Sequence, residues 1–234
     1  MHEIQLQILS RLIFKPSLKY TELKPDKELE NNQFSYHLDQ LIGLGFIKKD
    51  GVNYLLTEIG KEYSSRVETE SNKVVKQAKI SAWLGCVRTT NNINEYLIYT
   101  RKKHPFYGCQ GFCSGKIQYG ESFIGAACRE LLEETGLTGQ PKLALVKHYR
   151  VFNKTTRLIL EDKLMLMFRI DNPTGELKPD LSEGDYSWIA ENELNSKVTN
   201  YFEDKTAFNH QVEVLRNYDG KILFEETDYY GSNF

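Results

Sequence analysis

Apolar residues in the first 70 positions mostly recur every three or four residues, which is the period of an α-helix. The spacing predicts helices over residues 4–14, 21–23, 31–44 and 58–70, and prolines follow the first two. Before the last helix, FIKKDGVNYLLT contains an Asp-Gly pair that is typical of a tight turn between two strands. We therefore expect three helices, a β-hairpin and a fourth helix in this part of the chain.

From Ile80 the apolar pattern changes to short runs typical of β-strands, after a polar stretch over residues 71–79 that we interpret as a linker. The predicted strands are ISAWLGCVRT, EYLIYTRK, GFCSGKI, KLALVKHYRVF, LILEDKLMLMFRI, YSWI and KILFEETDYY. Short helices are expected over 191–194 and 204–217. We therefore predict a small domain over residues 1–70 and a larger α/β domain over 80–234.

One stretch among these strands, residues 121–135, contains no proline and predicts a helix. Glu130, Glu133 and Glu134 stand there at i, i+3 and i+4, so their carboxylates share one face. The opposite side carries apolar residues that we expect in the core: Ile124, Cys128, Leu131 and Leu132. Like charges at this spacing destabilise a helix unless a cation compensates them, and Mg²⁺ prefers carboxylate oxygens. A solvated acidic face is the alternative.

The residues around these glutamates form a longer pattern, GKIQYGESFIGAACRELLEETGL, over residues 115–137, here called the signature segment. Its order is a glycine, a glutamate six positions later, Arg-Glu, Glu-Glu, and a closing glycine with an aliphatic residue. This spacing resembles the signature of the Nudix hydrolases at every defining position. The resemblance implies an α/β/α sandwich with a mixed sheet, and an enzyme that cleaves a nucleoside diphosphate linked to another group.

The resemblance also implies roles for individual residues. Glu133 and Glu134 would be the principal ligands of Mg²⁺ or Mn²⁺, Glu130 a ligand or the general base, and the Ser114 carbonyl a further ligand. Arg129 would hold the carboxylates in place through Glu121, and Gly115, Glu121 and Gly136 would shape the segment. Members often place a base or an extra metal ligand in a later loop, which makes Glu183 the candidate here, with Asp185 behind it.

The sequence identifies the substrate less clearly than it identifies the reaction. Phe106, Tyr149 and Phe152 can stack on a nucleobase, although an aromatic residue of this kind is more often part of a hydrophobic core. Lys116 is a candidate phosphate contact. Phe152 stands where members specific for ADP-ribose often have proline, and the lead-in GFCSGKIQYGE favours nucleoside triphosphates. His104, Cys109 and Cys113 are too few ligands for a structural zinc site.

The first 70 residues resemble the winged helix-turn-helix domains of bacterial and archaeal regulators. Polar residues at the start of the third helix would then reach DNA base edges: Asn31, Asn32, Gln33, Tyr36 and His37. This part nevertheless holds nine Lys and Arg against eleven Asp and Glu, and phosphate neutralisation supplies much of DNA affinity. The alternative is a domain used for dimerisation or for covering the active site.

Composition sets the broad class of the protein. The chain has 234 residues, a formal net charge of −2 and 40% hydrophobic residues, so it has no overall basic field for nucleic acid or membrane. We see no signal peptide and no apolar run of membrane-spanning length. Four cysteines in no scaffold-like density indicate a reducing cytoplasm. A nucleotide-type substrate and a homodimer are expected by resemblance, and intact carboxylates favour an enzyme over a nucleotide-sensing transcriptional regulator.

Overall fold

The computed structural model describes residues 1–68, 71, 73–178 and 183–231. The chain forms two compact units, Met1–Gln77 and Ala78–Phe234, and each is described by itself. No helix in the described residues is long and apolar enough to cross a membrane. The boundary between the units falls at the end of the polar stretch that precedes the first long strand.

The first unit contains the predicted helices α1 (Glu3–Ile13), α2 (Tyr20–Leu23) and α3 (Asn31–Gly43). The predicted hairpin is β2 (Ile47–Asp50) and β3 (Asn53–Leu56), and β1 (Leu18–Lys19) pairs with β3 to give the order β1-β3-β2. Buried side chains from all three helices and the hairpin, including Leu9, Phe34, Leu38 and Ile47, make one core. This unit therefore has a hydrophobic core of its own.

The fourth helix is shorter than predicted. α4 (Glu58–Ser64) ends six residues before the expected position, and β4 (Val67–Glu68) then pairs with β5 (Lys73–Val74). The β-branched residues Val67 and Val74 stand opposite each other in this pairing, and Val67 is buried. β-branched residues favour strands over helices, so this local preference ends the helix early.

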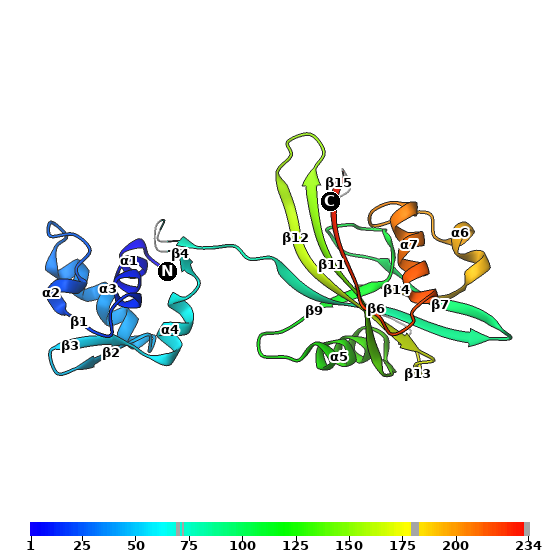
Figure 1. Ribbon diagram of the computed structural model, residues 1–234. Coiled ribbons are helices and arrows are strands. Elements are labelled where there is room, and N and C mark those ends of the chain that lie inside the picture. The colour runs from blue at the N-terminus through cyan, green and yellow to red at the C-terminus, as the bar shows by residue number, and fades with distance from the viewer. Residues whose placement is uncertain (69–70, 72, 179–182, 232–234) are drawn as a thin grey trace. The chain divides into compact units, whose positions relative to one another are not determined.

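The second unit is built on a mixed eight-stranded sheet (Figure 1). Its main path runs β14-β7-β6-β12-β11-β15, with β8 beside β7 and β9 beside β6. The strands are β6 (Lys79–Thr90), β7 (Ile93–Arg101), β8 (Gln110–Gly111), β9 (Cys113–Lys116), β11 (Pro141–Asn153), β12 (Ile159–Asp171), β14 (Gly184–Ala190) and β15 (Leu223–Gly231). β6 with β12 and β11 with β15 run parallel, and the other pairs are antiparallel. A separate two-stranded pair joins β10 (Leu137–Thr138) to β13 (Thr174–Gly175).

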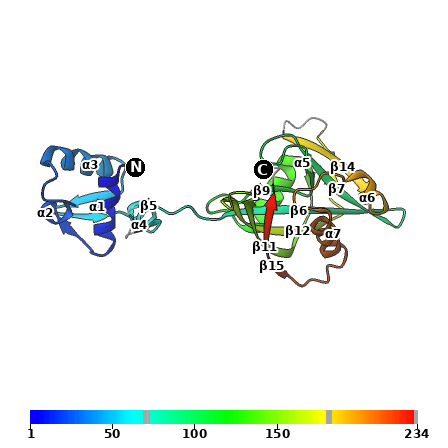
Figure 2. The same ribbon diagram turned by 90° about the horizontal axis from the view of Figure 1, so that it is seen from above.

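Helices cover both faces of this sheet (Figure 2). α5 (Phe123–Thr135) packs on the face that presents Leu84 and Phe168. The short η1 (Glu191–Glu193) and α6 (Leu194–Lys197) precede α7 (Lys205–Arg216), which packs on the face that presents Trp83 and Met167. Alternate residues of β6 point to opposite faces, so Trp83 and Leu84 enter different cores. The result is the α/β/α arrangement that the sequence predicts.

The orientation of α5 corrects one expectation. Ala126, Ala127 and Leu131 are buried, whereas Ile124 and Leu132 are 49% and 50% exposed and Cys128 is exposed. Two alanines let a helix approach a sheet more closely than branched side chains would. The helix therefore turns its small residues inward, and most of the apolar side that we expected in the core faces solvent.

Candidate active site

The ends of α5 are set by its own sequence. Ser122 precedes the helix, and its hydroxyl accepts a hydrogen bond from the Gly125 amide at 3.1 Å, which caps the first turn. Gly136 ends the helix in the left-handed conformation at φ 80°. A Cβ there would lie 2.6 Å from the Glu176 carbonyl oxygen, so this position requires glycine for both reasons. The two caps fix which turn carries each charged residue.

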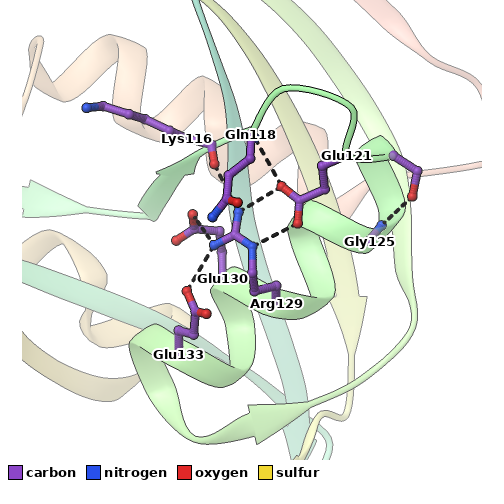
Figure 3. Close-up of polar contacts among 8 residues, drawn as sticks. Lys116, Gln118, Glu121, Gly125, Arg129, Glu130 and Glu133 are labelled. Carbon is purple, nitrogen blue, oxygen red and sulfur yellow. Dashed lines mark hydrogen bonds and ion pairs between the residues drawn. The ribbon is translucent and has the colours of Figure 1, made fainter.

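Arg129 connects the charged residues of the signature segment (Figure 3). Its Nε and Nη2 donate to the two Glu121 carboxylate oxygens, each at 2.8 Å, which is a bidentate pair. Its Nη1 donates to Glu130 at 2.8 Å and to Glu133 at 2.9 Å, and Nη2 also reaches the Lys116 carbonyl at 3.1 Å. The hydrogen bond from Arg129 lowers the pKa of Glu121 to about 2. Glu121 therefore stays ionised and anchors the guanidinium.

Glu130 is the buried member of the acidic group, with 7% of its surface exposed. Its carboxyl group lies directly over Gly115, where a Cβ would come within 1.8 Å of it. Burial raises the pKa of Glu130, and the hydrogen bond from Arg129 opposes that shift. Gly115 is thus the residue that leaves room for this carboxylate, and β9 holds it there by pairing with β6.

Glu133 and Glu134 have different surroundings despite their adjacent positions. The Glu133 side chain is 58% exposed and pairs with Arg129. Glu134 accepts a hydrogen bond from the Tyr186 hydroxyl at 3.0 Å, and burial raises the pKa of that tyrosine. Among the described residues, no group of three or more His, Cys, Asp or Glu side chains could by itself hold a metal ion.

A cavity of about 590 Å³ opens beside these carboxylates. Glu130 and Glu134 line it together with Ser114 and Gly115 of β9, so two carboxylates and a strand backbone share one wall. Cationic groups line it as well: Lys79, Arg101, Lys103, Lys116 and Lys163. Aromatic residues line it too: Trp83, Tyr99, Phe106, Phe112, Tyr149, Tyr201, Phe202 and Phe208. Further acidic residues, Glu161, Glu183, Glu203 and Asp204, also belong to the lining.

Residues 82–211 match the family model of the NUDIX domain, a range that contains the signature segment, the sheet strands from β6 to β14 and the first half of α7. The chain belongs to the Nudix family. It is a Nudix hydrolase, an enzyme acting on pyrophosphate bonds. Residues 1–67 match a second family model, described only as a domain of unknown function (DUF7347).

Nudix proteins of known structure share this fold. The mutator MutT protein of Bacillus halodurans is 21% identical, with a TM-score of 0.51 over 66% of this chain and 93% of that one. The NUDIX domain of Shewanella oneidensis NrtR, solved in complex with ADP-ribose, is 16% identical, with a TM-score of 0.51 over 69% of this chain and 97% of that one.

A relative by sequence is an ADP-ribose pyrophosphatase of Methanocaldococcus jannaschii, which is 26% identical over 170 residues, 72% of this chain and 91% of the relative.

Most of the residues predicted to bind the substrate or to act as a second base lie in the cavity. Lys116, Phe106, Tyr149 and Glu183 line it, and Glu183 forms an ion pair with Lys103. Phe152 does not line it. That ring stacks on Tyr230 of β15 with centroids 5.1 Å apart, because alternation along β11 carries Phe152 to the face opposite Tyr149.

Several residues at the site were not predicted from the sequence. Tyr186, which holds Glu134, lies in a strand that sequence periodicity identifies without indicating its partner. Glu161 and Lys163 stand two apart inside the apolar run LILEDKLMLMFRI, and both line the cavity. Charged residues on the inward side of a buried strand are unusual, and this signal was available in the sequence.

In the first unit, four of the five residues proposed for DNA contact are exposed on α3: Asn31, Asn32, Gln33 and Tyr36. His37 is not. It is 7% exposed, its ring stacks on His2 at 4.2 Å, and burial lowers its pKa. A buried ring cannot reach a base edge, so the structure removes His37 from that set.

Proposed function

We propose that the chain is a Mg²⁺- or Mn²⁺-dependent pyrophosphohydrolase of a nucleotide or nucleotide derivative. The observation that carries the proposal is the entry of Glu130 and Glu134, beside the Ser114–Gly115 backbone, into a cavity that also contains lysines and aromatic walls. Pyrophosphate needs cationic partners and a nucleobase needs apolar faces, and this one cavity offers both.

The donor set fits a hard divalent cation. Mg²⁺ is typically bound by one or two carboxylates together with waters and substrate phosphates, so two glutamates and the Ser114 carbonyl are a sufficient protein contribution. When bound, the ion would neutralise charge on the pyrophosphate and favour ionisation of a water molecule. Glu133 is one of the two principal ligands that the resemblance implies, and a contribution from it would require release from Arg129.

The residues of the site then have distinct roles in the proposed reaction. Glu130 has a second possible role in place of metal binding: with its pKa raised by burial, it is suited to accept a proton from the attacking water. Arg129 orients Glu130 and is itself held by Glu121. Lys116, which lines the cavity, would bind phosphate oxygens. Glu183 is the second candidate base and would have to leave its ion pair with Lys103.

The substrate panel should contain both nucleoside triphosphates and ADP-ribose. The sequence favours the former, whereas the Methanocaldococcus jannaschii relative is an ADP-ribose pyrophosphatase. We would measure phosphate, pyrophosphate and AMP release with Mg²⁺ or Mn²⁺ for the wild type, Glu134→Gln and a surface control, Glu193→Gln. Hydrolysis should depend on the metal and fall by about 100-fold or more in Glu134→Gln only. No turnover of any panel member would refute the proposal.

A nucleotide-responsive regulator is the second candidate function. The observation that favours it is the first unit, whose helices and hairpin follow the order of a winged helix and whose α3 exposes Asn31, Asn32 and Gln33. Selection from a random duplex library, followed by binding at several salt concentrations, tests it. Sequence-specific DNA binding without nucleotide turnover would favour the regulator. If no specific DNA binding is found, the remaining role for the first unit is assembly, most simply as a cytoplasmic homodimer. Light scattering of the full chain tests the dimer.

A further inference from the structure

Two buried polar groups on β11 and β12 belong to the cavity but not to the Nudix signature. Glu161 and Tyr149 both line it. β6 pairs with β9 along one edge and with β12 along the other, so β12 lies two strands from the Ser114–Gly115 backbone. At the usual strand spacing the two strands are about 10 Å apart sideways. Glu161 lies a further five residues along β12 from Leu166, the residue in register with Gly115 through Ala82, and Tyr149 lies on the next strand, β11. These groups therefore face a part of the substrate other than the atoms beside Glu130.

Each of the two groups has hydrogen-bonding capacity that the protein does not use. The Glu161 side chain is 4% exposed; its Oε1 pairs with Lys79 and Lys163, each at 3.1 Å. Its Oε2 has no hydrogen-bond partner within the described part of the chain, and neither has the Tyr149 hydroxyl. An unmade hydrogen bond at a buried polar group is costly, so two in one cavity point to a ligand that completes them.

The charges nearby decide what kind of group that ligand presents. Lys79 and Lys163 are paired with Glu161, and Lys147 is paired with Glu203 at 2.8 Å. A phosphate would meet two carboxylates whose lysines are already engaged. A carboxylate oxygen can only accept a hydrogen bond, and the tyrosine hydroxyl, whose pKa is raised by burial, remains protonated. A neutral group with hydroxyl or amino donors satisfies both.

We propose that Glu161 and Tyr149 form a specificity subsite that binds hydrogen-bond donors on the nucleoside part of the substrate. The proposal rests on the proposed pyrophosphohydrolase function. It concerns recognition of the nucleoside, the part of the substrate that the signature segment does not contact. Ribose hydroxyls and an exocyclic base amine share the required chemistry. A buried acceptor discriminates strongly against an analogue that lacks the donor, because the acceptor is then left unpaired.

The test measures binding by the full-length protein in EDTA, where the readout does not depend on turnover. The probes are ATP, 2′-deoxy-ATP and purine riboside 5′-triphosphate, which lacks the base amine. Glu161→Gln should weaken ATP binding by about 10- to 100-fold and reduce discrimination among the probes, because the amide oxygen is a weaker acceptor than the carboxylate. Tyr149→Phe should weaken it by about 3- to 10-fold. Glu193→Gln, an exposed glutamate paired with Lys197, is the matched control.

Thermal unfolding of the same variants separates recognition from a structural role. Because the Tyr149 hydroxyl has no partner in the described residues, Tyr149→Phe should not lower the melting temperature, although it weakens binding. Preference for ATP over 2′-deoxy-ATP assigns the donor to ribose, and preference over the purine riboside probe assigns it to the base. Either outcome supports the subsite.

Failure of this inference is distinguishable from failure of the proposed function. Unchanged ATP affinity in both variants, or no binding of any probe by the wild type, would overturn the subsite even if hydrolysis is observed. Reduced discrimination in Glu161→Gln, in a protein that hydrolyses none of the panel, would support the subsite and refute the proposed hydrolysis of nucleotides.

Discussion

At the scale of single residues, Gly115 is the position where the smallest change should have the largest effect. A Cβ there would lie 1.8 Å from the carboxyl carbon of Glu130, so Gly115→Ala must displace that side chain. We expect hydrolysis to fall by about 100-fold or more. Stability should fall by only about 1 to 3 kcal/mol, as for other overpacked sites. The measurements are steady-state kinetics and thermal unfolding.

Gly43→Ala is the matched control, because a Cβ at that glycine would have no neighbour within 4 Å. It should leave hydrolysis unchanged and keep or slightly raise stability, since alanine is the better helix former. Full activity in Gly115→Ala would show that the close contact with Glu130 is not needed for catalysis.

The three glutamates show what could be predicted for single residues and what could not. Helical spacing correctly places Glu130, Glu133 and Glu134 on one helix. Their separate environments depend on Gly115 and Tyr186, which reach α5 from strands elsewhere in the chain. Periodicity describes one element at a time, so it cannot identify the partner that a different strand supplies.

At the scale of elements, the orientation of α5 predicts that two neighbouring leucines contribute very differently to stability. Leu131 is fully buried and Leu132 is 50% exposed. Leu131→Ala should cost about 2 to 5 kcal/mol in the free energy of unfolding, whereas Leu132→Ala should cost less than about 0.5 kcal/mol. Denaturant unfolding followed by tryptophan fluorescence measures both. Comparable losses would show that the exposed side of α5 is covered in solution, as in a dimer.

The elements themselves could be predicted more fully than their faces. Strand runs, the acidic helix and the late helix all lie where apolar spacing and turn residues indicate. The expected buried face of α5 is wrong because hydrophobicity alone favours the larger apolar side chains and takes no account of side-chain volume. Ala126 and Ala127 decide the packing by allowing close approach, and burial of Glu130 at Gly115 requires the same orientation.

A pH-dependent contact joins the edge strand β15 to its neighbours. His148 of β11 contacts Asp162 of β12 at 2.9 Å and Glu226 of β15 at 3.3 Å, and these carboxylates raise its pKa. A raised pKa in the folded state gives stability that is fully present below the unfolded value of about 6.5 and is lost as pH rises through the folded value. His148→Gln should therefore lower the melting temperature by about 1 to 4 °C at pH 6 and progressively less above pH 7. A difference that is constant from pH 5 to 9 would contradict this.

At the scale of the whole molecule, catalysis should belong to the second unit alone. Within the described part of the chain, every residue that lines the cavity lies at or beyond Lys79, and each unit has its own buried core. A chain of residues 78–234 should therefore fold, with a cooperative thermal transition of its own. Its kcat/KM should stay within about threefold of the full chain, because no cavity-lining side chain is removed. Residues 1–77 should likewise unfold cooperatively when made separately.

A large loss of activity on truncation would have a specific meaning, because it would require the first unit to cover or complete the cavity. Adding residues 1–77 back in trans then distinguishes the two ways in which that can happen. Restored activity would indicate a contact between the units that a separate chain can re-form. Activity that stays low in a properly folded second unit would indicate that the covalent connection is needed. Unchanged activity would leave the first unit free for DNA binding or assembly, and the salt dependence of DNA binding would then decide between those roles.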